Sequence, residues 1–180
     1  MSKFLLCLYI ILCTISNIRA QEKSEDFSQI AAFEEKEEGA ILHTSKGNII
    51  CRFYGKEAPL SVGFFIESAK DGFYNGLTFY RIVPKYVIEA GDPDGRDFKI
   101  AAEIGQPHQR GALAWLRLPN YQNPEKLSSG SQFYITLENL SNLDQEYSVF
   151  GQIIDGIDIL DRLEEGDVIK NIEIVSLNEN

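Results

Sequence analysis

Cysteine and histidine are scarce in this 180-residue chain, which has three cysteines and two histidines. Neither His43 nor His108 stands at a recognisable spacing from another metal ligand or nucleophile, so a histidine-based metal site or catalytic triad has little support. Both histidines are expected at the surface or in turns, and no metal or other cofactor is predicted. Beyond the first twenty residues Cys51 stands alone in a strand-like run, which indicates a buried small hydrophobe rather than a reactive thiol.

Clusters of basic residues are also lacking. The 17 lysines and arginines are scattered among 27 aspartates and glutamates, which gives a formal net charge of −10 at pH 7. Proteins that hold nucleic acid gather Lys and Arg side chains on one surface. Nucleic acid is therefore not an expected partner, and the acidity bears mainly on solubility.

The sequence has no apolar run of the length that a membrane-spanning helix needs. Its most apolar segment, Phe4 to Ile15, is short for that purpose and lies between Lys3 and the small residue Ala20. This order is typical of a signal peptide, so residues 1–20 are predicted to direct export to a periplasmic or secreted location. The alternatives are a retained anchor or buried helix, and lipid attachment at Cys13. A membrane is expected as a partner only if the segment is retained or lipidated.

The remaining chain is predicted to form one domain. Residues 21–38 are polar and rich in acids, which indicates a linker. The folded domain is expected over residues 39–177, followed by a short tail at 178–180. With 44% hydrophobic residues the chain can build one core but hardly two, and a monomer is expected.

Short apolar or alternating runs separated by turn residues predict eight strands. They cover residues 40–44, 48–54, 78–83, 86–90, 111–116, 132–137, 148–153 and 169–177. Helical spacing predicts a helix from Pro59 until Asp71 and Gly72 stop it, and a second over 157–163. Many short strands with two separated helices favour a mainly β fold, a closed antiparallel barrel capped by two α-helices.

One arginine stands in unusually apolar and aromatic surroundings. Arg81 lies within Phe79 to Pro84, and the run Ser129 to Ile135 follows downstream. A guanidinium stays charged and presents a rigid set of donors, so its burial among apolar side chains is costly unless protein or ligand accepts them. A bound substrate is one candidate acceptor. The alternative is that the aromatic residues belong to the core and Arg81 forms a surface ion pair.

Several separated segments, in this order and spacing, resemble the cyclophilin-type peptidyl-prolyl cis-trans isomerases over about residues 39–176. The segments are Thr44 to Ile49, Glu57 to Pro59, Gly72 to Pro84, Gly91 to Pro93, Ser129 to Ile135 and Val149 to Gly151. The resemblance implies a closed eight-stranded β-barrel capped by two helices. It also implies an enzyme that isomerises X-Pro bonds without a cofactor, with X-Pro segments of client proteins as its partners.

The resemblance also implies roles for individual residues. Arg81 would be the catalytic arginine, and Gln132 would help to hold the peptide backbone. The proline pocket and its edge would comprise Tyr86, Val87, Tyr134, Leu143 and Tyr147, and the backbone ledge would comprise Leu116 and Arg117. An arginine suits the reaction because the prolyl nitrogen regains a lone pair when the amide twists, and a guanidinium can donate to it.

Some positions depart from the usual family pattern. Glu89 stands where a glutamine usually orients the arginine, and a carboxylate there could fix Arg81 while partly neutralising it. Asn142 replaces a pocket-side tryptophan, and tyrosines at several pocket positions predict a more polar pocket. The loop from Arg117 to Gly130 is longer than usual, so substrate preference does not carry over.

Three functions therefore stand at this point. The first is an exported isomerase that assists the folding of other exported proteins, with a turnover that Glu89 could reduce. The second is a binding or chaperone module that holds Pro-containing segments in the same groove without turnover, for which Glu89 and Asn142 are the reason. The third is a structural barrel whose groove is covered by the long loop.

Overall fold

Eight strands form one antiparallel sheet in the computed structural model, which describes residues 37–94 and 99–177. The strand order across the sheet is β3-β4-β6-β5-β7-β2-β1-β8. The predicted signal peptide, the predicted linker up to residue 36 and the tail at 178–180 lie outside the described residues. The mainly β class and the eight antiparallel strands are confirmed.

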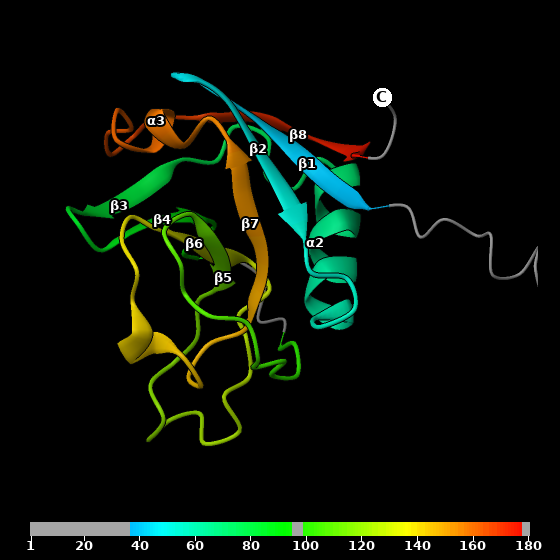
Figure 1. Ribbon diagram of the computed structural model, residues 1–180, viewed down its shortest axis with the longest axis vertical. Helices are drawn as coiled ribbons and strands as arrows, with labels where there is room; N and C mark the ends of the chain where they lie inside the picture. Colours follow the sequence, from blue (N-terminus) through cyan, green and yellow to red (C-terminus); the bar gives the residue numbers. More distant parts are fainter. Residues whose placement is uncertain (1–36, 95–98, 178–180) are drawn as a thin grey trace, which may run out of the picture. The chain divides into compact units, whose positions relative to one another are not determined.

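Every predicted strand is present, with ends that shift by one or two residues (Figure 1). The first hairpin is also as expected, since Thr44 pairs with Gly47 at its turn and the Thr44 hydroxyl donates to the Gly47 carbonyl at 2.6 Å. The strands are β1 Glu38–Thr44, β2 Gly47–Phe53, β3 Phe79–Val83, β4 Val87–Gly91, β5 Ala112–Trp115, β6 Gln132–Thr136, β7 Val149–Asp155 and β8 Ile169–Ser176.

The sheet curls into a half-barrel that stays open, so the prediction of a closed barrel is wrong. The two end strands, β3 and β8, are not joined by a ladder, and one antiparallel bridge between Thr78 and Val168 connects their beginnings. Farther along β3, the N–H of Ile82 donates to the Glu165 carboxylate at 3.0 Å. A side chain thus occupies a position on this edge where a closing strand would supply a carbonyl.

The helix α2, Pro59–Lys70, packs against β8. Proline opens the helix as predicted, because its missing N–H is not needed in the first turn. Ala58 supplies no side-chain cap, and the carboxylate of Glu103 accepts hydrogen bonds from Leu60 and Ser61 at 2.9 and 2.8 Å instead. The helix is therefore capped from a distant loop, which sequence signals near its own start could not indicate.

The second helix, α3 Ile157–Leu160, ends three residues before the predicted end at Leu163. A short 3₁₀ turn, η1 Ser141–Leu143, was not predicted, and it places Leu143 beside the groove described below. Within residues 37–94 and 99–177, no helix has both the length and the apolar character needed to cross a membrane.

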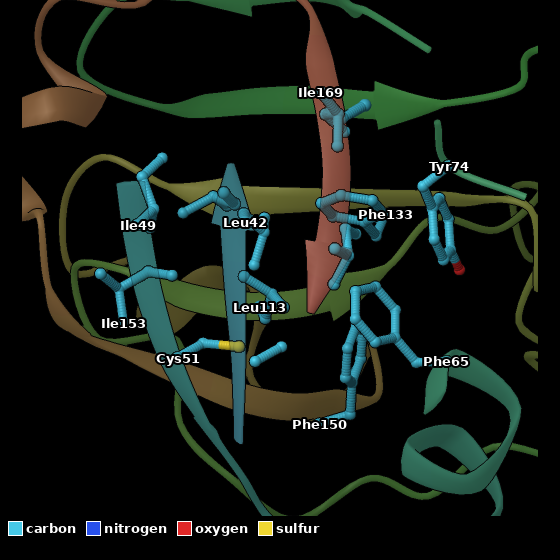
Figure 2. Packing of buried hydrophobic residues seen from close by; sticks show 14 of the residues in the cluster. Leu42, Ile49, Cys51, Phe65, Tyr74, Leu113, Phe133, Phe150, Ile153 and Ile169 are labelled. Atoms are coloured by element: carbon cyan, nitrogen blue, oxygen red, sulfur yellow. The ribbon is translucent and has the colours of Figure 1, made fainter. Parts of the chain in front are cut away.

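The main core lies on the inner face of the curled sheet (Figure 2). Phe65 of α2 packs against Phe133 and Phe150, with ring centroids 5.5 and 5.1 Å apart. Cys51 is fully buried, and burial raises the pKa of its thiol to about 12. This confirms its prediction as a small core residue. A second apolar cluster is separate from this core, and it lies at the candidate site.

Candidate active site

The register of three neighbouring strands places the predicted catalytic residue beside the predicted pocket. Arg81 on β3 pairs with Glu89 on β4, and Glu89 pairs with Tyr134 on β6. Because residues paired across neighbouring strands point to the same side of a sheet, these three residues share one face. Ile88 and Ile135 point to the opposite face and belong to the main core.

Arg81 forms an ion pair with Glu89, in which Nη1 donates to Oε1. The two partners differ in environment, because the Arg81 side chain is 55% exposed whereas that of Glu89 is 12% exposed. The ion pair that the alternative interpretation expected is therefore present, but its acid is buried next to Tyr134 rather than free on the surface. The Arg81 side chain keeps about half of its surface open to solvent.

Tyr80 joins this polar group through an irregularity in the sheet. The register shifts between Phe79 and Arg81, so Tyr80 is an extra residue on β3. Its hydroxyl donates to Oε1 of Gln132 at 3.0 Å. Burial raises the pKa of Tyr80, as does the negative charge of Glu89, so the hydroxyl stays protonated as a donor. Tyr80 was not among the predicted site residues, because a bulge is not visible in the pattern of side chains.

The predicted pocket residues come together in the second apolar cluster. Val87 and Tyr134 are buried in it, and the partly buried residues packed against it include Tyr86, Leu116, Leu143 and Tyr147. The rings of Tyr134 and Tyr147 meet edge to face, with centroids 5.7 Å apart. The four partly buried residues of the cluster keep some exposure to solvent. The loop from Arg117 to Gly130 therefore does not cover the cluster.

His108 is buried and contacts the pocket residue Tyr134, so the expectation of a surface or turn histidine is wrong. Its side chain is fully buried, and both ring nitrogens have partners inside the protein. Nε2 lies 2.8 Å from the hydroxyl of Tyr134, and Nδ1 lies 2.9 Å from a carboxylate oxygen of Asp144. That carboxylate also accepts the backbone N–H of His108 at 2.8 Å, and Asp144 directly follows Leu143. The network therefore connects Tyr134 of the pocket to the residue that follows the η1 turn.

The protonation of this network follows from burial and hydrogen bonding. Desolvation lowers the pKa of His108, although its contact with Asp144 opposes that change. The hydrogen bonds from His108 lower the pKa of Asp144. A neutral ring can donate from Nδ1 to Asp144 and accept the Tyr134 hydroxyl at Nε2, which satisfies all three groups.

Arg117, which was predicted to form a backbone ledge with Leu116, has a buried side chain. Its side chain is 4% exposed, and its guanidinium donates to the Glu146 carbonyl and carboxylate, each at 2.7 Å, and to the Leu118 carbonyl at 2.9 Å. It also lies over the ring of Tyr147, 4.6 Å from the centroid. The N–H of Leu116 donates to the Gln132 carbonyl at 3.0 Å, so this part of the ledge already has a partner.

The site contains polar donors and an apolar pocket, but no cluster that suits a metal ion. In the described part of the chain, no group of three His, Cys, Asp or Glu side chains gathers in that way. The arrangement can bind an apolar ring in the pocket and present the guanidinium of Arg81 as a cationic donor beside it. It therefore defines a site suited to a peptide or similar ligand along the outer face of β3, β4 and β6.

Comparison with known proteins gives this class a family. Residues 40–179 match the model of the cyclophilin type peptidyl-prolyl cis-trans isomerases. A peptidyl-prolyl cis-trans isomerase of Helicobacter pylori is 34% identical over 143 residues, which cover 74% of this chain and 85% of the relative. Another from Synechococcus elongatus is 35% identical over 145 residues, covering 76% of this chain and 96% of the relative.

Solved structures agree with the sequence comparison. A Cryptosporidium parvum cyclophilin type isomerase matches with a TM-score of 0.69 at 25% identity, over 78% of this chain and 98% of that one. A second structure, of the same protein in the presence of the dipeptide Ala-Pro, matches with a TM-score of 0.67 at 26% identity, over 77% and 99%. The chain belongs to the cyclophilin-type peptidyl-prolyl cis-trans isomerases, and it is an isomerase of X-Pro bonds.

Proposed function

We propose that the outer face of β3, β4 and β6 isomerises X-Pro bonds in protein clients, with Arg81 as the catalytic residue. The observation that carries the proposal is the placement of one half-exposed guanidinium beside an apolar pocket formed by Val87 and Tyr134. The related structure obtained in the presence of Ala-Pro supports a proline ligand. A proline ring is apolar and fits such a pocket without needing a hydrogen-bond partner.

The chemistry requires only a preference for the twisted amide. Resonance holds the X-Pro amide planar, with a rotation barrier of about 18–20 kcal/mol. When the amide twists, the prolyl nitrogen regains a lone pair that can accept a hydrogen bond. Arg81 has five N–H donors. Glu89 accepts from Nη1 of Arg81, so other donors of the guanidinium remain available to the prolyl nitrogen. A donor that acts mainly in the twisted state lowers the barrier.

Gln132 would hold the peptide backbone next to the reacting bond. Its Oε1 accepts the Tyr80 hydroxyl, which fixes the orientation of the amide group. The N–H donors of that amide are then directed to a peptide carbonyl. Tyr80 is thus a positioning residue, and it acts through Gln132.

We place this activity outside the cytoplasm, in the folding of other exported proteins, with the protein acting as a monomer. The support for export is the sequence of residues 1–20, in which Lys3 precedes an apolar run that ends before Ala20. Uncatalysed X-Pro isomerisation takes tens of seconds or longer, so a catalyst would accelerate folding wherever such a step is limiting.

The ion pair between Arg81 and Glu89 favours a second candidate function. If the carboxylate neutralises the guanidinium too fully, the groove would hold proline segments without accelerating their isomerisation. The two functions share one pocket and differ only in rate, so measurements of both binding and rate distinguish them.

The test is the cis-trans exchange rate of an Ala-Pro peptide, measured by NMR exchange spectroscopy with the purified protein. Acceleration is expected for the parent, and it should be lost in the double variant Arg81→Ala, Glu89→Gln, which removes the arginine without leaving a buried carboxylate unpaired. Arg162→Ala is the matched control, because Arg162 is an exposed arginine paired with Asp158 away from the groove. Binding without acceleration in the parent would favour the second function, and equal acceleration by the double variant would exclude Arg81 as the catalytic residue.

A further inference from the structure

A hollow of about 480 Å³ adjoins the pocket and shares two of its side chains. Leu143 and Tyr147 line the hollow and also pack against the apolar pocket cluster. The loop after β5 contributes Pro119, Asn120 and Tyr121. We call this space the flanking hollow. Its volume lies in the range of about 300–1,000 Å³ that is typical of ligand sites, so it is large enough to receive a side chain.

The flanking hollow is built in advance by bonds between the loop and the segment before β7. Arg117 donates to Glu146 and packs on the ring of Tyr147. Lys126 donates to the Gln145 carbonyl at 2.8 Å and lies 3.1 Å from the Glu146 carboxylate. A ligand entering this space would therefore meet walls that are already held in place, which lowers the ordering cost of binding.

Tyr121 is the most exposed large apolar side chain of this region. It is 81% exposed, and its hydroxyl accepts a hydrogen bond from the Gln122 amide at 3.0 Å. The neighbouring Leu118 is 54% exposed. Neither side chain contributes to the core, and exposed aromatic residues beside a pocket are frequent sites of binding energy.

Charge in the flanking hollow argues against a basic ligand. The carboxylate of Glu146 is the anion in the lining, and it is already paired with Arg117 of the lining and with Lys126 outside it. A lysine or arginine of a client would therefore find no unpaired carboxylate there, although the chain as a whole is acidic. An aromatic side chain needs no such partner and can stack on Tyr121.

We propose that the flanking hollow is a specificity subsite that receives an aromatic side chain of the client next to its proline. The inference rests on the proposed function, because the hollow continues from the pocket in which the proline ring would sit. It assigns a purpose to the long loop from Arg117 to Gly130, which brings Tyr121 to the site. The same client would thus be held at two adjacent points, the proline ring and the neighbouring aromatic ring.

The test compares four peptides that differ only next to proline. One has alanine on both sides, two have phenylalanine before or after proline, and one has lysine in place of the favoured phenylalanine. Isomerisation is followed by NMR exchange spectroscopy, with the full chain, Tyr121→Ala and Leu60→Ala. Leu60 is the matched control, since it is a 56% exposed apolar residue on α2.

One phenylalanine peptide should show a kcat/KM about three- to tenfold above the alanine peptide, as expected for one aromatic pair. Tyr121→Ala should remove this gain and Leu60→Ala should retain it. A gain that survives Tyr121→Ala, the absence of any gain, or a gain with lysine instead would overturn the subsite. If even the alanine peptide is not accelerated, the proposed function fails. Peptide binding, measured by titration, then tests the subsite through the same loss of phenylalanine preference in Tyr121→Ala.

Discussion

Replacement of Glu89 by glutamine should raise the rate of isomerisation. The carboxylate of Glu89 is nearly buried and bonds directly to Nη1 of Arg81. Glutamine keeps a hydrogen bond from the charged guanidinium but loses the charge attraction of the ion pair, a difference of about 0.2–1 kcal/mol for a partly exposed pair. If about 1 kcal/mol of this difference becomes available to the twisted amide, kcat/KM should increase about fivefold.

The same substitution should have little effect on stability. Arg81 is half exposed, so water can solvate its guanidinium when the carboxylate is gone, and the free energy of unfolding should change by less than about 1 kcal/mol. Arg81→Ala is different because it leaves the Glu89 carboxylate buried without its cation. That change should cost about 3–5 kcal/mol, which is the reason to combine it with Glu89→Gln in any rate measurement.

The assay is NMR exchange spectroscopy on an Ala-Pro peptide, with urea unfolding measured for each variant in the same buffer. The reasoning would be refuted by a folded Glu89→Gln protein whose kcat/KM equals or falls below that of the parent. Such a result would mean that the carboxylate orients Arg81, and that this orientation contributes more to the rate than the charge that it neutralises.

Three further predictions concern the frame of the site. Tyr134→Phe should lower the free energy of unfolding by about 1–2 kcal/mol, measured in urea, because it leaves buried Nε2 of His108 without its hydroxyl partner. Stability should fall as the pH drops from about 7 to 5.5, because the unfolded histidine takes up a proton near its ordinary pKa of 6.5 whereas the folded one has a lower pKa. Urea unfolding across this range should show a smaller fall in His108→Gln than in the parent; an equal fall in the two proteins would contradict the assignment. Gly91→Ala should destabilise the protein by at least about 3 kcal/mol in the same assay, because φ is +108° and the new Cβ would lie 2.2 Å from the Ser131 carbonyl oxygen. A change below about 1 kcal/mol would show that the β4 end can relax.

Much of the fold could be predicted because local patterns determine it. Alternation and turn residues located all eight strands to within two residues, and Pro59 marked the start of α2. Closure of the sheet could not be predicted in this way, since it depends on how far the curl brings β3 towards β8. The cap of α2 by Glu103 could not be predicted either, because Glu103 lies more than forty residues from Leu60 and Ser61 in the sequence.

The candidate site was predictable where a residue's chemistry conflicts with its surroundings. Arg81 was conspicuous among aromatic residues, and the resemblance to a family supplied the pocket around it. Residues whose role depends on tertiary contacts were missed or misplaced. His108 has no motif around it, and its partners Tyr134 and Asp144 come from other segments, while the role of Tyr80 depends on a bulge.

The most direct test of the account is to measure kcat and KM separately for the parent and Arg81→Lys. Lysine keeps the positive charge opposite Glu89 but lacks the planar set of donors. If Arg81 donates to the prolyl nitrogen mainly in the twisted state, kcat should fall about a hundredfold or more while KM changes by less than about threefold. An unchanged kcat, or a loss that appears only in KM, would contradict a catalytic role for Arg81 and leave the groove as a proline-binding site.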